Sequence, residues 1–234
     1  MINSPKIEYK KRKTISVSIN TMGELVVKAP IGCPMEIINK FLTDKQAWID
    51  SKLKKMDDRI EKYAEIINYQ KLLVFGKSYY GYSSGAVKKI TLTEDKILIP
   101  ATVTPDKLHS KITNWYHKYA DQILIPRTEE ISKMLNLIPT NIKCTGSRGR
   151  WGACNSKGEL FLNWRLVMLS PHLIDYVIVH ELAHLLELNH SPRFWAEVGK
   201  VLRDYKSRRK ELKEFGFCLK LFWNNYVQIS NSMI

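Results

Sequence analysis

Long hydrophobic runs are missing from this chain of 234 residues. Its apolar residues are interrupted by charge throughout, and no stretch approaches the roughly 18 residues that a helix needs to cross a bilayer. The first residues, MINSPKIEYKKRKTIS, carry basic side chains but no apolar segment behind them, which argues against a secretory signal. We therefore expect a cytoplasmic protein with no membrane partner.

Cysteine is also scarce. The four cysteines, Cys33, Cys144, Cys154 and Cys218, are widely separated and form no CxxC pair. Disulfide frameworks and thiolate zinc sites place their cysteines at closer, more regular spacings. We expect free thiols, which agrees with a cytoplasmic location.

Acidic residues are few compared with basic ones. The chain has 23 Asp and Glu against 37 Lys and Arg, which gives a formal net charge of +14. A basic surface attracts nucleic acid, acidic protein or anionic lipid at long range, but a lysine-rich solvated surface has the same composition. The densest basic clusters lie at residues 6–13 and 200–213. Charge alone does not choose among these partners.

Internal repeats and low-complexity tracts are absent, and the remaining composition is that of an ordinary globular protein, with 44% hydrophobic and 26% charged residues. The length suits one large domain or two small ones. We expect a boundary near residue 101, which divides residues 1–100 from residues 101–216. We leave residues 217–234 as a tail of unknown role.

The first part reads as β-rich with one long helix. Residues 14–29 alternate apolar and polar side chains around Met22-Gly23, which predicts a β-hairpin. Residues 34–56 carry apolar side chains at helical spacing and predict one amphipathic helix, which can continue to Ile67. Residues 71–99 are again β-like.

The second part begins with Thr104-Pro105, a cap and first-turn proline typical of a helix start. This helix is expected to run to about Leu137, with a kink or break at Pro126. Residues 140–145 and 159–168 are β-like, and the glycine-rich loop SRGRWGACNSKG lies between them.

The most informative stretch is HELAHLLELNH, residues 180–190, which holds three of the six histidines. An apolar stripe that starts after Ser170-Pro171 predicts a helix here, and Asn189 can end it in a left-handed conformation. Ser191-Pro192 begins the next helix.

The spacing of these histidines predicts a catalytic metal site. His180 and His184 are four residues apart on one helical face, so their imidazoles can bind one Zn²⁺. Glu181 lies beside the metal, in position to take a proton from a zinc-bound water, and His190 can return after the helix as a third ligand. Three protein ligands and a water leave the open position of a catalytic site, with one Zn²⁺ per chain.

The remaining three histidines have no partner residue at the spacing of a metal site. His109 and His117 are expected on the surface, and His172 is too far along the helix to share the metal. Glu187 is either an acceptor for a ligand imidazole or a solvated acid at the helix end, and we favour the latter.

The motif HELAHLLELNHSPRFW, preceded by RGRWGACNSKGELFLNWRLVMLSPHLIDYVIV, resembles the YgjP-like zinc metallopeptidases, relatives of the SprT-like and WLM proteases among the zincins. The resemblance is close over residues 148–212 and extends over most of the chain, up to about residue 216. It implies a metal-dependent hydrolase of peptides or proteins. His180, His184 and His190 match the ligand positions, and Glu181 matches the catalytic glutamate.

The resemblance also implies an α+β, zincin-like fold, with the motif helix under a short, mainly antiparallel sheet. The edge strand of such a sheet lines the cleft, and residues 159–167 are our candidate for it. Arg148, Arg150 and Trp151 precede this strand. A cation there can hold a substrate carboxylate or an oxyanion, although a structural arginine and a core tryptophan are the plainer interpretations.

Three functions stay open at this point. The first is a cytoplasmic zinc metallopeptidase. The second is a DNA-associated factor of SprT-like type that processes protein bound to DNA, which the net charge of +14 also favours. The third is a non-catalytic module that zinc only stabilises. Three imidazoles would also suit Ni, Co or Fe.

Overall fold

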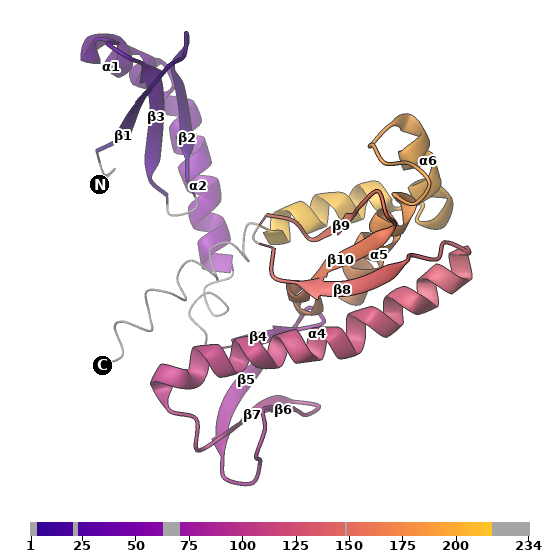
Figure 1. Ribbon diagram of the computed structural model, residues 1–234. Helices are drawn as coiled ribbons and strands as arrows, with labels where there is room; N and C mark the ends of the chain where they lie inside the picture. The colour runs from indigo at the N-terminus through magenta and orange to yellow at the C-terminus, as the bar shows by residue number, and fades with distance from the viewer. Residues whose placement is uncertain (1–3, 21–22, 63–70, 148, 217–234) are drawn as a thin grey trace.

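The computed structural model describes residues 4–20, 23–62, 71–147 and 149–216. In these ranges, helices combine with three small sheets of three or four strands (Figure 1). The predicted α+β class is confirmed. None of the helices in the described ranges is both long and apolar enough to cross a membrane.

The first sheet is formed by three strands: β1 (Lys6–Lys10), β2 (Ser16–Ile19) and β3 (Leu25–Pro30). β2 and β3 pair antiparallel as the predicted hairpin, while β1 pairs parallel with the other side of β3. β3 buries Val27 and Ala29, which pack with Ile38 in a small core. This alternation explains why the strand forms, because one face of the sheet is apolar.

The helix predicted over 34–56 is two helices, α1 (Met35–Asp44) and α2 (Gln46–Lys62). Lys45 separates them with non-helical dihedrals, φ −101° and ψ 4°. α1 buries Ile38 against the first sheet, and α2 buries Ile49 and Met56, the latter beside Gly23 in the turn between β2 and β3. The predicted continuation to Ile67 lies outside the described residues.

The second sheet follows the order β4-β5-β7-β6. Its strands are β4 (Lys71–Val74), β5 (Lys77–Ser84), β6 (Thr91–Leu92) and β7 (Lys96–Pro100). This sheet shares the main core, because Leu72, Leu73, Val74 and Ile97 pack with residues from the second half of the chain. The amide of Phe75 also donates to the carbonyl of Val167, at 2.8 Å.

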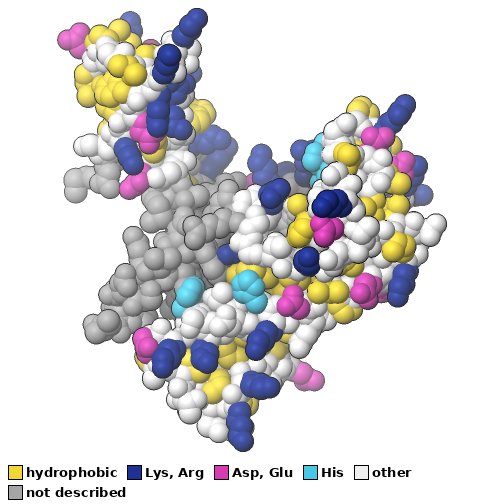
Figure 2. Space-filling model, in the orientation of Figure 1, with side chains coloured by type: hydrophobic (Ala, Val, Ile, Leu, Met, Phe, Trp, Pro, Cys, Tyr) yellow, Lys and Arg dark blue, Asp and Glu magenta, His cyan; other side chains and the backbone are white. Residues whose placement is uncertain are grey.

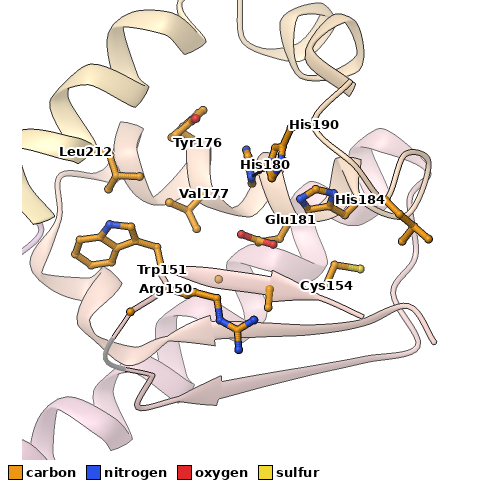
Figure 3. Close-up of a pocket in the computed structure, with 14 residues that line it drawn as sticks. Arg150, Trp151, Cys154, Tyr176, Val177, His180, Glu181, His184, His190 and Leu212 are labelled. Atoms are coloured by element: carbon orange, nitrogen blue, oxygen red, sulfur yellow. Dashed lines mark hydrogen bonds between the residues drawn. The ribbon is translucent and has the colours of Figure 1, made fainter. Parts of the chain in front are cut away.

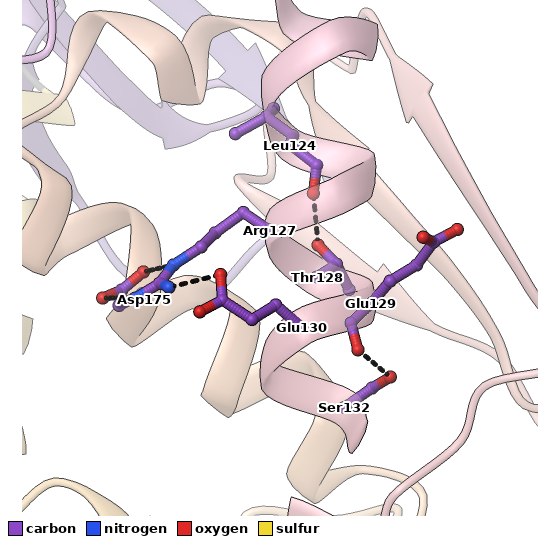
Figure 4. Close-up of polar contacts among 7 residues, drawn as sticks. All are labelled: Leu124, Arg127, Thr128, Glu129, Glu130, Ser132 and Asp175. Atoms are coloured by element: carbon purple, nitrogen blue, oxygen red, sulfur yellow. Dashed lines mark hydrogen bonds and ion pairs between the residues drawn. The ribbon is translucent and has the colours of Figure 1, made fainter. Parts of the chain in front are cut away.

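The long helix α4 (Pro105–Leu135) continues through Pro126, so of the predicted kink or break, the break does not occur. Proline removes one hydrogen bond from a helix interior, and a helix with an interior proline is less stable by about 3 kcal/mol. Buried side chains on both sides of Pro126, from Tyr116 to Ile131, hold the helix against one core. Arg127 also reaches from α4 to Asp175 with two hydrogen bonds of 2.8 and 2.7 Å (Figure 4).

The third sheet has the order β8-β10-β9. Its strands are β8 (Asn141–Thr145), β9 (Gly152–Cys154) and β10 (Glu159–Asn163), and the 3-10 helix η1 (Trp164–Met168) follows. β10 pairs parallel with β8 and antiparallel with β9, so this sheet is mixed rather than mainly antiparallel.

The candidate edge strand at 159–167 is therefore wrong. β10 is the central strand, because the tight turn at 155–158 folds β9 back along its outer side. Residues after Asn163 leave the sheet, since the Asn163 side chain accepts the amide of Arg165 and starts η1. The edge beside the motif helix is β9.

The motif begins in the last turn of α5 (Pro171–Ala183), which packs against β9 and β10 and is buried on most sides. His184 is the C-cap of this helix, and His190 lies beyond it. α6 (Pro192–Val201) follows, and residues 205–216 form a further helical segment. α5 ends at Ala183, and Asn189 is not left-handed as predicted. Turns follow Ala183, because the amides of Leu185 and Leu186 donate hydrogen bonds to carbonyl oxygens three residues earlier in the chain.

Candidate metal centre

The three motif histidines converge at the carboxyl end of α5 (Figure 3). One ligand nitrogen from each of His180, His184 and His190 lies within 4.8 Å of the other two. Nε2 of His190 is 3.0 Å from Nε2 of His180. Two nitrogens that share a tetrahedral zinc at 2.0–2.1 Å would be about 3.3 Å apart, so these side chains fit a metal of that size.

The turn after α5 brings His190 back to the helix. Asn189 accepts the amide of Ser191 at 3.0 Å, and the Ser191 hydroxyl accepts the amide of Phe194 at 3.3 Å. These bonds fix the start of α6 directly after His190. The third histidine is therefore held by a capped helix, although its own side chain is exposed.

The protonation of the histidines suits metal binding. Nδ1 of His184 lies 2.9 Å from the carbonyl oxygen of Glu187, which can only accept, so Nδ1 donates its proton there and Nε2 is the nitrogen left to face a metal. Burial, followed by the nearby His184, His190 and Arg209, lowers the pKa of His180 to about 3. Burial, His184 and Arg209 also lower the pKa of His190. Neutral imidazole is the form that binds metal.

Glu181 lies beside the histidines under the edge strand. It is 6% exposed, and burial raises its pKa to about 7, while Arg150 acts in the opposite direction. A Cβ atom at Gly152 would lie 2.6 Å from Oε1 of Glu181. The glycine therefore lets the carboxylate pack directly against the backbone of β9.

An open pocket joins these groups. Its walls are the edge strand, one side of α5, the turn after α5 and the helical segment 205–216 (Figure 3). Besides the metal-site residues, the lining includes Gly149, Arg150, Trp151, Gly152, Ala153, Cys154, Tyr176, Val177, Leu188 and Leu212.

Two of the other predicted site residues, Arg150 and Trp151, line this pocket. Arg150 is exposed there, and no ion pair involves its guanidinium within the described ranges. Trp151 lines the pocket and also approaches the helical segment 205–216, where a Cβ at Gly216 would be 3.6 Å from its Nε1. Arg148 lies outside the described residues.

Some residues that shape the site were missed from the sequence. Asn163 donates to the carbonyls of Ser147 and Arg150, at 2.6 and 2.8 Å, and so fastens the loop that carries Arg150. Phe194 on α6 contacts the motif histidines, a fact that spacing along the helix does not reveal.

The remaining histidines and Glu187 differ in part from expectation. His109 and His117 are half-buried rather than on the surface, because α4 packs on more than one side, and the His117 ring lies 4.7 Å from that of Trp164. His172 pairs with Glu211 at 2.9 Å, away from the metal site. The backbone carbonyl of Glu187, rather than its side chain, forms the hydrogen bond with His184.

A comparison with protein-family profiles agrees with the motif. The profile of the family described as YgjP-like, metallopeptidase domain, matches residues 13–215. Among solved structures, the chain is similar to one titled crystal structure of the metallopeptidase zymogen of Pyrococcus abyssi abylysin. That match has 22% identity and a TM-score of 0.35, and covers 38% of this chain and 91% of the other. No curated protein matches the chain.

Proposed function

The chain belongs to the YgjP-like metallopeptidase family, and from this premise we propose that it is a zinc-dependent hydrolase that cleaves peptide bonds in peptides or proteins. The observation that carries the proposal is the convergence of three imidazole nitrogens within 4.8 Å, next to a buried glutamate. His180, His184 and His190 would hold one Zn²⁺. Glu181 would be the general base.

A bound zinc ion supplies a Lewis acid that lowers the pKa of water and polarises a substrate carbonyl. The protein's own part in the reaction rests on Glu181. Its carboxylate accepts a proton from the attacking water and then donates that proton to the leaving amine. Because this carboxylate is buried, its pKa is raised to about 7, and it is a stronger base than an exposed glutamate.

The edge strand gives the substrate a place to bind. β9 pairs on one side with β10, and its residues line the pocket beside Glu181. An extended peptide can add to this edge through backbone hydrogen bonds, which would place its scissile carbonyl between Glu181 and the histidines. Arg150, in the loop just before β9, would bind a substrate carboxylate or the developing oxyanion.

Metal content and hydrolysis test this proposal together. The full chain, purified without a His-tag, should contain about one zinc per chain, and His184→Ala should lose both zinc and hydrolysis of a labelled peptide library. Glu181→Gln should keep the zinc and lower the rate by about 10²–10⁴-fold, since it removes the base alone. Hydrolysis that survives Glu181→Gln unchanged would refute the mechanism.

The other two functions are weaker. In Figure 2, Lys and Arg side chains are scattered over the visible face and mixed with Asp and Glu, with no continuous basic groove to favour DNA. If zinc only stabilises a binding module, we expect no hydrolysis of peptides, and Glu181→Gln should leave the folded protein unchanged. No metal in the wild-type chain, even after zinc is supplied, would end the enzyme proposal.

A further inference from the structure

One phenylalanine contacts all three candidate ligand rings. The ring centroid of Phe194 lies 4.8 Å from that of His180, 4.5 Å from that of His184 and 4.8 Å from that of His190. The contacts with His180 and His190 are edge-on, and the contact with His184 is stacked. Phe194 is completely buried, so its own position is fixed by the core.

Ligand histidines are usually oriented by a hydrogen bond on the ring nitrogen that does not face the metal. Among the residues that the structure describes, His184 has this arrangement, through the carbonyl of Glu187. Nδ1 of His180 is buried and has no hydrogen-bond partner among the described residues. Packing must therefore set the orientation of the His180 ring.

Trp195 provides a second contact for the most exposed ligand. Its indole stacks on His190, with centroids 5.7 Å apart and an interplanar angle of 27°. Tyr205 stacks on Trp195 at 5.3 Å and 13°, and the guanidinium carbon of Arg209 lies 4.8 Å from the Trp195 ring centroid. The tryptophan is thus held from the helical segment 205–216, and it limits rotation of His190.

We propose that Phe194 and Trp195 are positioning residues, an aromatic clamp that preorganises the three imidazoles for one metal ion. The proposal rests on the metal site of the proposed function and deepens it. The capped start of α6 fixes the clamp relative to His190, since Ser191 bonds the amide of Phe194. Without the clamp, His180 and His190 would have to lose ring freedom when they bind metal, which weakens affinity.

Zinc affinity measured by competition with a chromophoric chelator tests the clamp in the full chain. Phe194→Leu and Trp195→Ala should each weaken zinc binding by at least about 10-fold, the scale seen when groups that orient metal ligands are removed. Trp195→Phe keeps a stacking ring and should bind nearly as the wild type does. Val198→Ala is the matched control, because Val198 is equally buried on α6 and belongs to the same core.

A purely structural role predicts a different result. Phe194→Leu and Val198→Ala would then lower the unfolding temperature similarly and bind zinc equally well, which would overturn the proposal. The visible spectrum of the Co²⁺-loaded protein adds a readout of ligand geometry, and it should change in Phe194→Leu but not in Val198→Ala. If Phe194→Leu does not fold, the contrast between Trp195→Ala and Trp195→Phe decides.

The failure of the clamp is distinguishable from failure of the proposed function. A wild-type chain that binds zinc while the clamp variants bind it equally tightly overturns the clamp alone. A wild-type chain that binds no zinc overturns both.

Discussion

The N-terminal residues 4–62 and the residues 71–216 differ in the depth of their packing. The buried cluster of the first region consists of Val27, Ala29 and Ile38, with a few half-buried neighbours. The second region buries one continuous core that reaches from the second sheet through α4 to α6. A small core contributes little stability, and the three histidines of the metal centre all lie in the second region.

This comparison also bears on the domain division expected near residue 101. The strands at 71–100 share the core of α4 and η1 rather than that of the first sheet. We therefore propose that the two units divide between residues 62 and 71.

The largest effect is expected from a cavity in the deeper core. Trp164 is 1% exposed and packs on Tyr116 with centroids 5.7 Å apart. Trp164→Ala should destabilise residues 71–216 by about 3–5 kcal/mol, because the lost contacts leave a cavity. Hydrogen exchange should show the loss of protection there and unchanged protection in β1–β3. Equal loss in both regions would mean that they unfold as one unit.

A smaller effect is expected from one added methyl group beside the metal site. Gly152→Ala would force the Glu181 carboxylate away from β9, because the new Cβ would overlap it. A displacement of about 1 Å should lower kcat for peptide hydrolysis by about 10²-fold. Zinc content should be unchanged. Gly85→Ala is the control, since a Cβ there meets nothing within 4 Å, and an equal loss in that variant would contradict the explanation.

The smallest effect on function is expected in the first region. Ile38 is fully buried between α1 and the first sheet. Ile38→Ala should destabilise residues 4–62 by about 2 kcal/mol, seen as faster hydrogen exchange in β1–β3. Zinc affinity and the rate of hydrolysis of short peptides should stay at their wild-type values. A drop in zinc affinity would show that the two regions are coupled.

Much of the secondary structure follows from local patterns. The hairpin at 14–29 and the helix starts at Pro105, Pro171 and Pro192 are read from alternation, caps and first-turn prolines, which act over a few residues. The failures have non-local causes. The helix continues through Pro126 because buried side chains on both sides hold it to the core, which no local propensity records.

The sequence by itself determined which residues can chelate a metal. Two histidines four apart on a helix must share a face, whatever surrounds them, and Glu181 must lie beside them. Only the tertiary structure decided how this site is completed. Strand order made β9 the edge, the close approach of α5 put Glu181 against Gly152, and α6 brought Phe194 to all three histidines. These are contacts between separate elements, set by how the core packs rather than by spacing along the chain.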